Sequence, residues 1–288
     1  MTPNDKKQLR MTACKVRQGI IESTYCAKCG HPGGSLSAAD MFTYLYFKEL
    51  NVDPTNPKWE DRDRFVLSKG HTAPGLYAAL AHRGFFPVED LKTLRKLGSY
   101  LQGHPNMNTV PGVDMSTGSL GQGISAACGM ALAAKKQGKQ NRVYTLLGDG
   151  EIQEGQVWEA CMFASHYHLD NLCVIVDNNG LQIDGEVAKV MSPYPIVDKL
   201  AAFGFDVQQI DGHDFDPIEE AFNHARTVKG KPSAIVIKST KGKGVSFMEN
   251  NAGWHGKAPN DAEYAQALSE LKAQLAELYA LAAELEGM

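Results

Sequence analysis

Two short polar motifs in the middle of the chain follow apolar runs and are separated by one helix-like segment. The first contains Asp149 between two glycines, and the second is the pair Asn178 and Asn179. The Asp149 carboxylate, the Asn179 amide oxygen and the main-chain carbonyl of Leu181 are ligands of the kind that Mg²⁺ prefers, with phosphate oxygens completing the shell. Either motif alone is typical of a helix cap or a turn. Together, at this spacing, they favour a site for a divalent cation and a diphosphate.

A glycine-rich segment, TGSLGQG, ends at Gly123 and leads into an alanine-rich helix. Residues 118–123 could present main-chain N–H groups and a helix N-terminus to a phosphate. A glycine-rich helix entry without a ligand explains the same pattern equally well. On its own, the segment leaves both interpretations open.

Four of the nine histidines lie in turns bounded by glycine or proline. They are His31 and His104, each in GHP, His71 in SKGH and His255 in WHG. One such histidine would be an ordinary turn residue, but four suggest imidazoles that line a polar cavity. Imidazoles can bind sugar hydroxyls and stabilise developing alkoxides near neutral pH. Their spacing does not match a metal motif such as HExxH.

Three glutamates, Glu151, Glu154 and Glu159, follow Asp149 closely. Carboxylates suit the first turn of a helix because they interact favourably with its dipole. That interpretation is favoured for Glu151. For Glu154 and Glu159, a role as buried carboxylates at a subunit contact stays open.

The elements that must position these residues alternate between strands and helices. Strands are predicted at 64–67, 142–147, 172–177, 206–210 and 233–238. Helices are predicted at 4–25, 41–50, 88–97, 154–167, 196–203 and 216–228. A further helix is predicted to begin near residue 74, and another follows the glycine-rich segment and ends near residue 138. This alternation predicts an α/β fold with a mainly parallel sheet covered by helices on both faces.

The connecting segments carry their own predictions. GHPGG at 30–34 is expected to be a turn that neither a helix nor a strand continues, and Ser37 and Asp40 resemble a capping box. Residues 98–117 are expected to form a long loop without periodic pattern, and a loop of this size in a compact domain is usually functional or disordered. Apolar residues from Tyr264 to Leu285 recur in steps of three and four, so the end of the chain is expected to be a helix that packs on its own sheet, or less favourably on a partner.

The bulk properties exclude several classes of protein. The net charge of -4 gives no electrostatic footprint for nucleic acid, and no apolar run approaches a membrane span or a signal-peptide core. A cytoplasmic protein is therefore expected. Cys26 and Cys29 form a lone CxxC, and because a zinc site would need a second ligand pair, incidental thiols are favoured over a metal or redox role.

The motifs GHPGG, SKGH, GHP, TGSLGQG, GDG…NN and WHG, in this order, resemble the N-terminal half of transketolases. The resemblance implies a diphosphate-binding domain for thiamine diphosphate over residues 1–260, followed by a C-terminal helix at 261–288. It implies that Mg²⁺, or Ca²⁺ or Mn²⁺ in its place, is held by Asp149, Asn179 and the Leu181 carbonyl. The implied reaction moves a two-carbon ketol unit from a ketose to an aldose, usually as sugar phosphates.

The resemblance also assigns roles to individual residues. Cofactor-binding positions correspond to His71, Gly118, Ser119, Leu120, Asp149, Gly150, Asn179 and His255. Glu154 is also expected to bind the cofactor. In addition, Glu154 and Glu159 match carboxylates that meet across the dimer interface in that family. His31, His104 and His255 are expected to assist proton transfers at the substrate hydroxyls.

In complete transketolases a second domain supplies the glutamate that activates the cofactor, and no glutamate here matches it. The chain therefore resembles the N-terminal subunit of a two-chain transketolase, expected to be inactive alone. Its partner would carry the pyrimidine-binding domain in a heterotetramer with two copies of each chain. The pathway could be the pentose phosphate pathway or a dedicated catabolic route. The alternatives are the α subunit of a 2-oxoacid dehydrogenase, a deoxyxylulose-phosphate synthase, and a non-catalytic cofactor-binding subunit.

Overall fold

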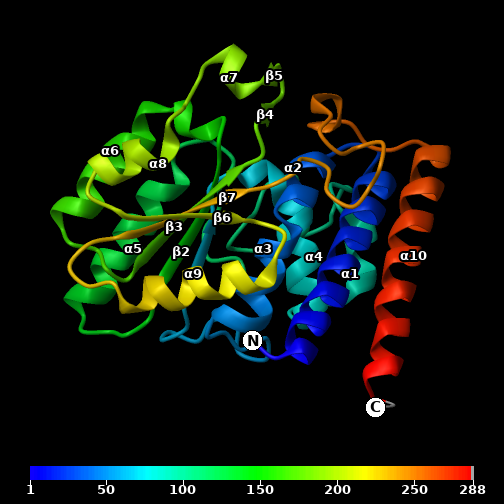
Figure 1. Ribbon diagram of the computed structural model, residues 1–288, viewed down its shortest axis with the longest axis horizontal. Helices are drawn as coiled ribbons and strands as arrows, with labels where there is room; N and C mark the ends of the chain where they lie inside the picture. Colours follow the sequence, from blue (N-terminus) through cyan, green and yellow to red (C-terminus); the bar gives the residue numbers. More distant parts are fainter. Residues whose placement is uncertain (287–288) are drawn as a thin grey trace.

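A five-stranded, all-parallel sheet forms the centre of the computed structural model, which describes residues 1–286, with side chains to residue 280 (Figure 1). Its order is β1-β2-β3-β7-β6. The strands are β1 (Arg64–Leu67), β2 (Val143–Gly148), β3 (Leu172–Asn178), β6 (Asp206–Asp211) and β7 (Ser233–Lys238). Each predicted strand is confirmed to within one or two residues at its ends.

Helices cover both faces of this sheet. On one face lie α1 (Pro3–Ala27), α3 (Ala39–Tyr44), α4 (Ala73–Arg83) and α9 (Phe215–Thr227), and on the other α5 (Gly123–Lys136), α6 (Gly155–His166) and α8 (Ile196–Ala202). In Figure 1 the sheet is seen between α5 and α6 on its left and α1 and α4 on its right. Because both faces of β2, β3 and β7 are buried, these strands are mainly apolar, whereas the edge strand β6 is polar and partly exposed. The predicted fold class is confirmed.

The register of the two central strands brings the two polar motifs together. Gly148, the last residue of β2, pairs with Asp177 of β3. Asp149 and Asn179 therefore follow neighbouring strand ends at the carboxyl edge of the sheet, where open α/β sheets bind ligands.

The GHPGG segment is not the isolated turn that was predicted. Pro32 begins a short helix, α2 (Pro32–Ser37), because proline at the first helical position loses no hydrogen bond and has a suitable φ. The predicted capping box is also wrong. Ser37 is the last residue of α2 and donates its hydroxyl to Asp177, and the Asp40 carboxylate is paired with Arg17.

Two further helix predictions need correction. Residues 88–97 form only a short 3-10 helix, η3 (Val88–Thr93), instead of an α-helix. The helix expected at 41–50 is α3 continued by a π-helical turn, η1 (Leu45–Glu49). The long irregular loop predicted at 98–117 is present and continues to the start of α5.

The C-terminal helix α10 (Asp261–Glu286) lies along α1 and not directly on the sheet (Figure 1). The Tyr25 and Tyr264 rings stack at 3.8 Å, and Leu271 is fully buried. The predicted apolar seam thus packs on its own domain as far as the described side chains extend. Ala282 and Leu285, which also belong to that seam, lie outside the part of the chain whose side chains are described.

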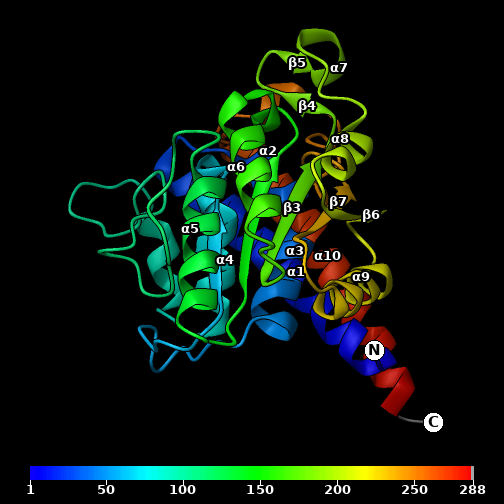
Figure 2. The ribbon, with the colours of Figure 1, turned by 90° about the vertical axis from the view of Figure 1, so that its left-hand side faces the viewer.

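Small elements surround the carboxyl edge of the sheet. They are η2 (Gly70–Thr72), η4 (Glu151–Gln153), η5 (Ala252–Trp254), the antiparallel pair β4 (Leu181–Gln182) and β5 (Gly185–Glu186), and α7 (Val187–Val190). The β4–β5 pair and α7 project beyond the sheet in both views (Figure 2). Within residues 1–286, no helix is long and apolar enough to cross a membrane.

Candidate active site

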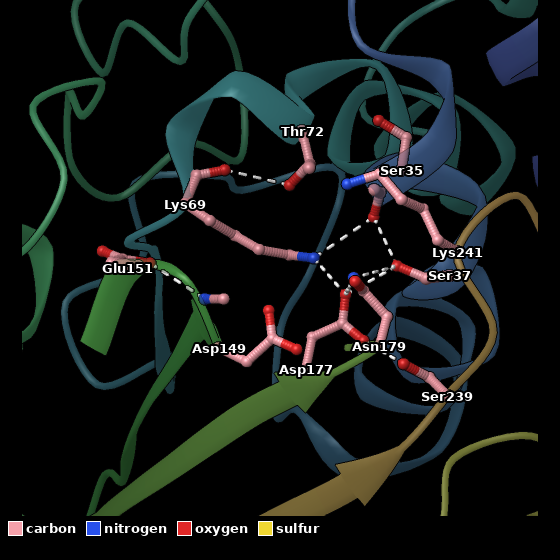
Figure 3. Close-up of polar contacts among 12 residues, drawn as sticks. Ser35, Ser37, Lys69, Thr72, Asp149, Glu151, Asp177, Asn179, Ser239 and Lys241 are labelled. Atoms are coloured by element: carbon pink, nitrogen blue, oxygen red, sulfur yellow. Dashed lines mark hydrogen bonds and ion pairs between the residues drawn. The ribbon is translucent and has the colours of Figure 1, made fainter. Parts of the chain in front are cut away.

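A cavity of about 350 Å³ lies at the carboxyl ends of β1, β2 and β3. It contains most of the residues singled out from the sequence, namely His31, His71, Gly118, Leu120, Asp149, Gly150, Glu154, Asn179, Leu181 and His255. Segments from six separate parts of the chain therefore meet in one place. Figure 3 shows the polar contacts at the floor of this cavity.

Asp149 is held by two main-chain N–H groups. Its carboxylate accepts hydrogen bonds from Gly150 N at 2.8 Å and Gly180 N at 2.6 Å. Burial and the nearby charge of Asp177 raise the pKa of Asp149 to about 6. A buried carboxylate beside a second one is stabilised by a cation, so this environment suits a divalent metal ion.

Asn179 and Leu181 place two further oxygens near Asp149. The Asn179 Oδ1 accepts a hydrogen bond from Leu181 N at 3.1 Å and retains a second lone pair. The Leu181 carbonyl accepts from the Lys241 ammonium at 3.0 Å, so a cation already lies at that oxygen. Burial and the charge of Lys69 lower the pKa of Lys241 to about 8.

His31, His71 and His255 form one cluster, which we call the histidine cluster. Their ring centroids lie 5.1–5.5 Å apart. Burial, aided by the charge of Arg95 on His31 and of Lys241 on His255, lowers the pKa of His31 to about 4 and of His255 to about 3. Burial lowers the pKa of His71 as well. All three imidazoles are therefore neutral near pH 7.

Two predicted site residues lie outside the cavity lining. The His104 ring packs against Gly118, where an added Cβ would lie only 3.0 Å from its Cδ2 atom. Ser119 lines a smaller neighbouring pocket of about 170 Å³. The His104 ring thus packs against the glycine-rich segment, and its charge affects the pKa of His31. Its role in proton transfer stays a prediction.

The glycine-rich segment is anchored by a glutamate that the sequence did not single out for this purpose. Glu151 is 2 % exposed and accepts hydrogen bonds from the Ser68 hydroxyl at 2.5 Å and from the N–H groups of Gly121 and Gly148, both at 3.0 Å. The Gly121 N–H is therefore used inside the protein and does not reach a phosphate. Glu151 lies in the first turn of η4, but interaction with a helix dipole does not explain its burial.

Glu154 and Glu159 differ from Glu151 because both are exposed. Glu154 occupies the N-cap position of α6 and makes no side-chain capping bond, and it lines the cavity. Glu159 lies on the same helix. A role at a subunit contact stays a prediction for both.

A buried ion pair lies beneath the predicted metal ligands (Figure 3). The Lys69 ammonium bonds to the Asp177 carboxylate, and also to the Gly34 carbonyl at 3.2 Å. The Lys69 and Asp177 side chains are 2 % and 0 % exposed. Burial would raise the pKa of Asp177, but the Lys69 charge and the hydrogen bonds from Lys69, Ser239 and Ser37 together outweigh burial, and the pKa is lowered. Lys69, Asp177 and Lys241 are site residues that motif reading missed.

The donor set fits Mg²⁺ and a diphosphate-bearing cofactor. One carboxylate, one amide oxygen and one main-chain carbonyl are hard oxygen donors. Among the described residues, no three His, Cys, Asp or Glu side chains cluster in a way that would hold a metal, which leaves phosphate oxygens and water to complete the shell. The His31 Nδ1 atom is buried without a hydrogen-bond partner in the described part of the chain, so a ligand atom can satisfy it.

The thiols take no part in this cavity. Cys14, Cys128, Cys161 and Cys173 are buried, whereas Cys26 and Cys29 are partly exposed. Burial raises the pKa of Cys128, Cys161 and Cys173 to about 12. We expect Cys26 and Cys29 alone to react rapidly with Ellman's reagent in the native chain, and the other four only after denaturation. Rapid reaction of all six thiols would contradict this packing.

The comparisons with known proteins agree with the motifs. Residues 10–286 match the family described as "Transketolase, thiamine diphosphate binding domain". The chain is 46 % identical over 264 residues to the 6-deoxy-6-sulfo-D-fructose transketolase subunit SqwG of Clostridium sp. (strain MSTE9), covering 92 % of this chain and 96 % of that one. It is 42 % identical over 270 residues to an apulose-4-phosphate transketolase subunit of Phocaeicola vulgatus, covering 94 % and 96 %.

Single-chain transketolases match over part of their length. The crystal structure of the Campylobacter jejuni transketolase superimposes with a TM-score of 0.85 at 32 % identity, over 96 % of this chain and 46 % of that one. The chain thus spans about half the length of the solved transketolases it matches. These matches favour the transketolase interpretation over the dehydrogenase, synthase and non-catalytic alternatives. The relatives of similar length are named as separate transketolase subunits. The chain therefore belongs to the transketolase family and corresponds to the N-terminal, thiamine diphosphate-binding domain of that family.

Proposed function

We propose that the chain is one subunit of a two-chain transketolase that transfers a two-carbon ketol unit between sugar phosphates. The observation that carries the proposal is the convergence of the Asp149, Asn179 and Leu181 oxygens beside the histidine cluster. A metal and diphosphate site next to neutral imidazoles suits a cofactor reaction on a polyhydroxylated substrate.

Each group of residues has a task in this proposal. Asp149, Asn179 and the Leu181 carbonyl would hold Mg²⁺, while Gly118, Leu120 and Gly150 frame the cofactor. The chemistry that thiamine diphosphate supplies when bound is the nucleophile and electron sink needed to break and form a carbon–carbon bond. His31 and His255, as neutral imidazoles, would accept a proton from a sugar hydroxyl and return it later. His104, whose ring packs against Gly118, would also assist proton transfer at a substrate hydroxyl.

We propose that the partner subunit docks on the rim of the cavity. Leu120 and Ile183 line the cavity and are 36 % and 64 % exposed, and Met162 and Phe163 of α6 are 56 % and 37 % exposed. Large exposed apolar side chains mark interaction surfaces. A C-terminal subunit with the pyrimidine-binding domain would cover them, in a heterotetramer with two copies of each chain.

The sugar is proposed only as a class. The two relatives above are named for different ketoses, a sulfo-deoxyfructose and an apulose phosphate. The present chain is similar to both, so we propose a ketose donor carrying a terminal anionic group and an aldose acceptor. The pathway is proposed only as either the pentose phosphate pathway or a dedicated catabolic route.

The test is reconstitution with the C-terminal subunit from the same source. The chain alone is expected to bind thiamine diphosphate and Mg²⁺ without turnover. The mixture of both subunits is expected to transfer glycolaldehyde from a ketose phosphate to an aldose phosphate, detected by mass spectrometry of the products. A complex that binds the cofactor but decarboxylates a 2-oxoacid, or that turns over no ketose–aldose pair, would show the proposal to be wrong.

A further inference from the structure

We propose that Asp177 is a positioning residue that fixes the orientation of the Asn179 amide, and with it the oxygen that this side chain offers to a divalent cation. The inference rests on the proposed metal site. It assigns a role to a buried carboxylate that does not itself line the cavity.

Asp177 is 0 % exposed and accepts four side-chain hydrogen bonds (Figure 3). The donors are the Ser37 hydroxyl at 2.6 Å, the Asn179 Nδ2 at 3.1 Å, the Ser239 hydroxyl and the Lys69 ammonium. Ser37 ends α2, Lys69 follows β1 and Ser239 follows β7. One carboxylate thus joins four separate segments directly behind the cavity.

An ionised carboxylate accepts hydrogen bonds and donates none. Asp177 therefore bonds only to the NH₂ end of the Asn179 amide. The oxygen end is held by Leu181 N at 3.1 Å. A flipped amide would place oxygen against the carboxylate and NH₂ against an N–H donor, so both contacts disfavour the flip and the Asn179 oxygen stays available to a cation.

Lys69 makes this arrangement possible. Its ammonium supplies the counter-charge that a fully buried carboxylate needs. The Ser37 and Ser239 hydroxyls also donate to this carboxylate, so all four of its side-chain contacts use it as an acceptor. This acceptor role is the property that orients Asn179.

A purely structural role for Asp177 gives different expectations from a positioning role. Asp177→Asn removes the acceptor-only character, because an amide can also present NH₂ to Asn179. Ser239→Ala is the matched control, since it removes one donor to the same carboxylate and leaves the Asn179 contact in place. A structural role alone would lower the melting temperature in both variants without changing metal affinity in the folded protein.

The test uses the full chain with saturating thiamine diphosphate and Mn²⁺ as the probe, titrated by electron paramagnetic resonance. Asp177→Asn is expected to raise the Mn²⁺ dissociation constant by about 10- to 100-fold, as for other residues that orient metal ligands, and Ser239→Ala by less than about 3-fold. An unchanged dissociation constant in Asp177→Asn, with tight binding by the wild-type chain, would overturn the positioning role and leave the proposed function standing. A wild-type chain that binds no Mn²⁺ would overturn both.

A second measurement does not depend on the folding of Asp177→Asn. The Asn179 side-chain NH₂ resonances of the metal-free wild-type chain, identified by their loss in Asn179→Ser, are expected to exchange with solvent at least about 10-fold more slowly than a free amide. Exchange at the rate of an exposed amide would contradict the hydrogen bond to Asp177 and the inference with it.

Discussion

Replacing Asp149 with alanine is expected to weaken the binding of Mg²⁺ and thiamine diphosphate by more than about 100-fold, beyond the range typical of residues that only orient a ligand. Asp149 is the one carboxylate in the proposed donor set, and the remaining donors are uncharged. The variant should stay folded, because the Gly150 and Gly180 N–H groups it leaves without an acceptor are only partly buried. Isothermal titration calorimetry with Mg²⁺ and cofactor measures the loss, and circular dichroism verifies the fold.

The matched control is Asp184→Ala. Asp184 is an exposed acid close to Leu181 in the sequence, in the turn between β4 and β5. Its removal changes the net charge by the same amount without touching the donor set, so the cofactor affinity should change by less than about 2-fold. Equal losses in the two variants would mean that Asp149 acts through long-range charge and does not bind the metal.

Glu151→Leu is expected to destabilise the chain by about 3–9 kcal/mol, because each buried donor left without an acceptor costs about 1–3 kcal/mol. Three donors lose their acceptor, namely the Ser68 hydroxyl and the N–H groups of Gly121 and Gly148. Glu151→Gln keeps one oxygen and should cost about half as much. Urea denaturation followed by circular dichroism gives the free energies of unfolding.

Glu159→Leu provides the comparison for this prediction. It makes the same chemical change at an exposed position of α6, where surface substitutions are usually within about 0.5 kcal/mol. If Glu151→Leu were as stable as Glu159→Leu, the contacts at Glu151 would contribute nothing to the fold, and the anchoring of the glycine-rich segment would need another explanation.

The fold could be predicted well because the inner strands β2, β3 and β7 are buried on both faces. Apolar runs such as Val143–Leu147 can be read locally, and their alternation with helices fixes the fold class. The errors have local causes. Pro32 indicated a turn but begins α2, and Ser37 has the residue type of a cap but bonds to Asp177. Residues 88–97 have a helical pattern, but only Val88–Thr93 form a helix, and it is a 3-10 helix.

Residues of the site could be predicted only where they lie in recognisable sequence motifs. Asp149, Asn179 and the histidines lie in short patterns with glycine or proline, and most of them meet in one cavity. Lys69 lies in the SKGH motif, but no motif indicated a role for Lys69, Asp177 or Lys241. A lysine or aspartate in a sequence is usually exposed, and the pairing of Lys69 with Asp177 joins residues 108 positions apart. Only the order of the strands reveals it.

The long separation of these contacts has a consequence for biogenesis. Ser37 and Asp177 are 140 residues apart, and Lys69 reaches the same carboxylate from β1, so the ligand-binding edge exists only after the sheet has closed around β3. Non-local pairing of this kind forms slowly, and a partly folded chain would lack the cofactor site. Cofactor binding is therefore expected to stabilise only the completed domain and to shift the folding equilibrium toward it.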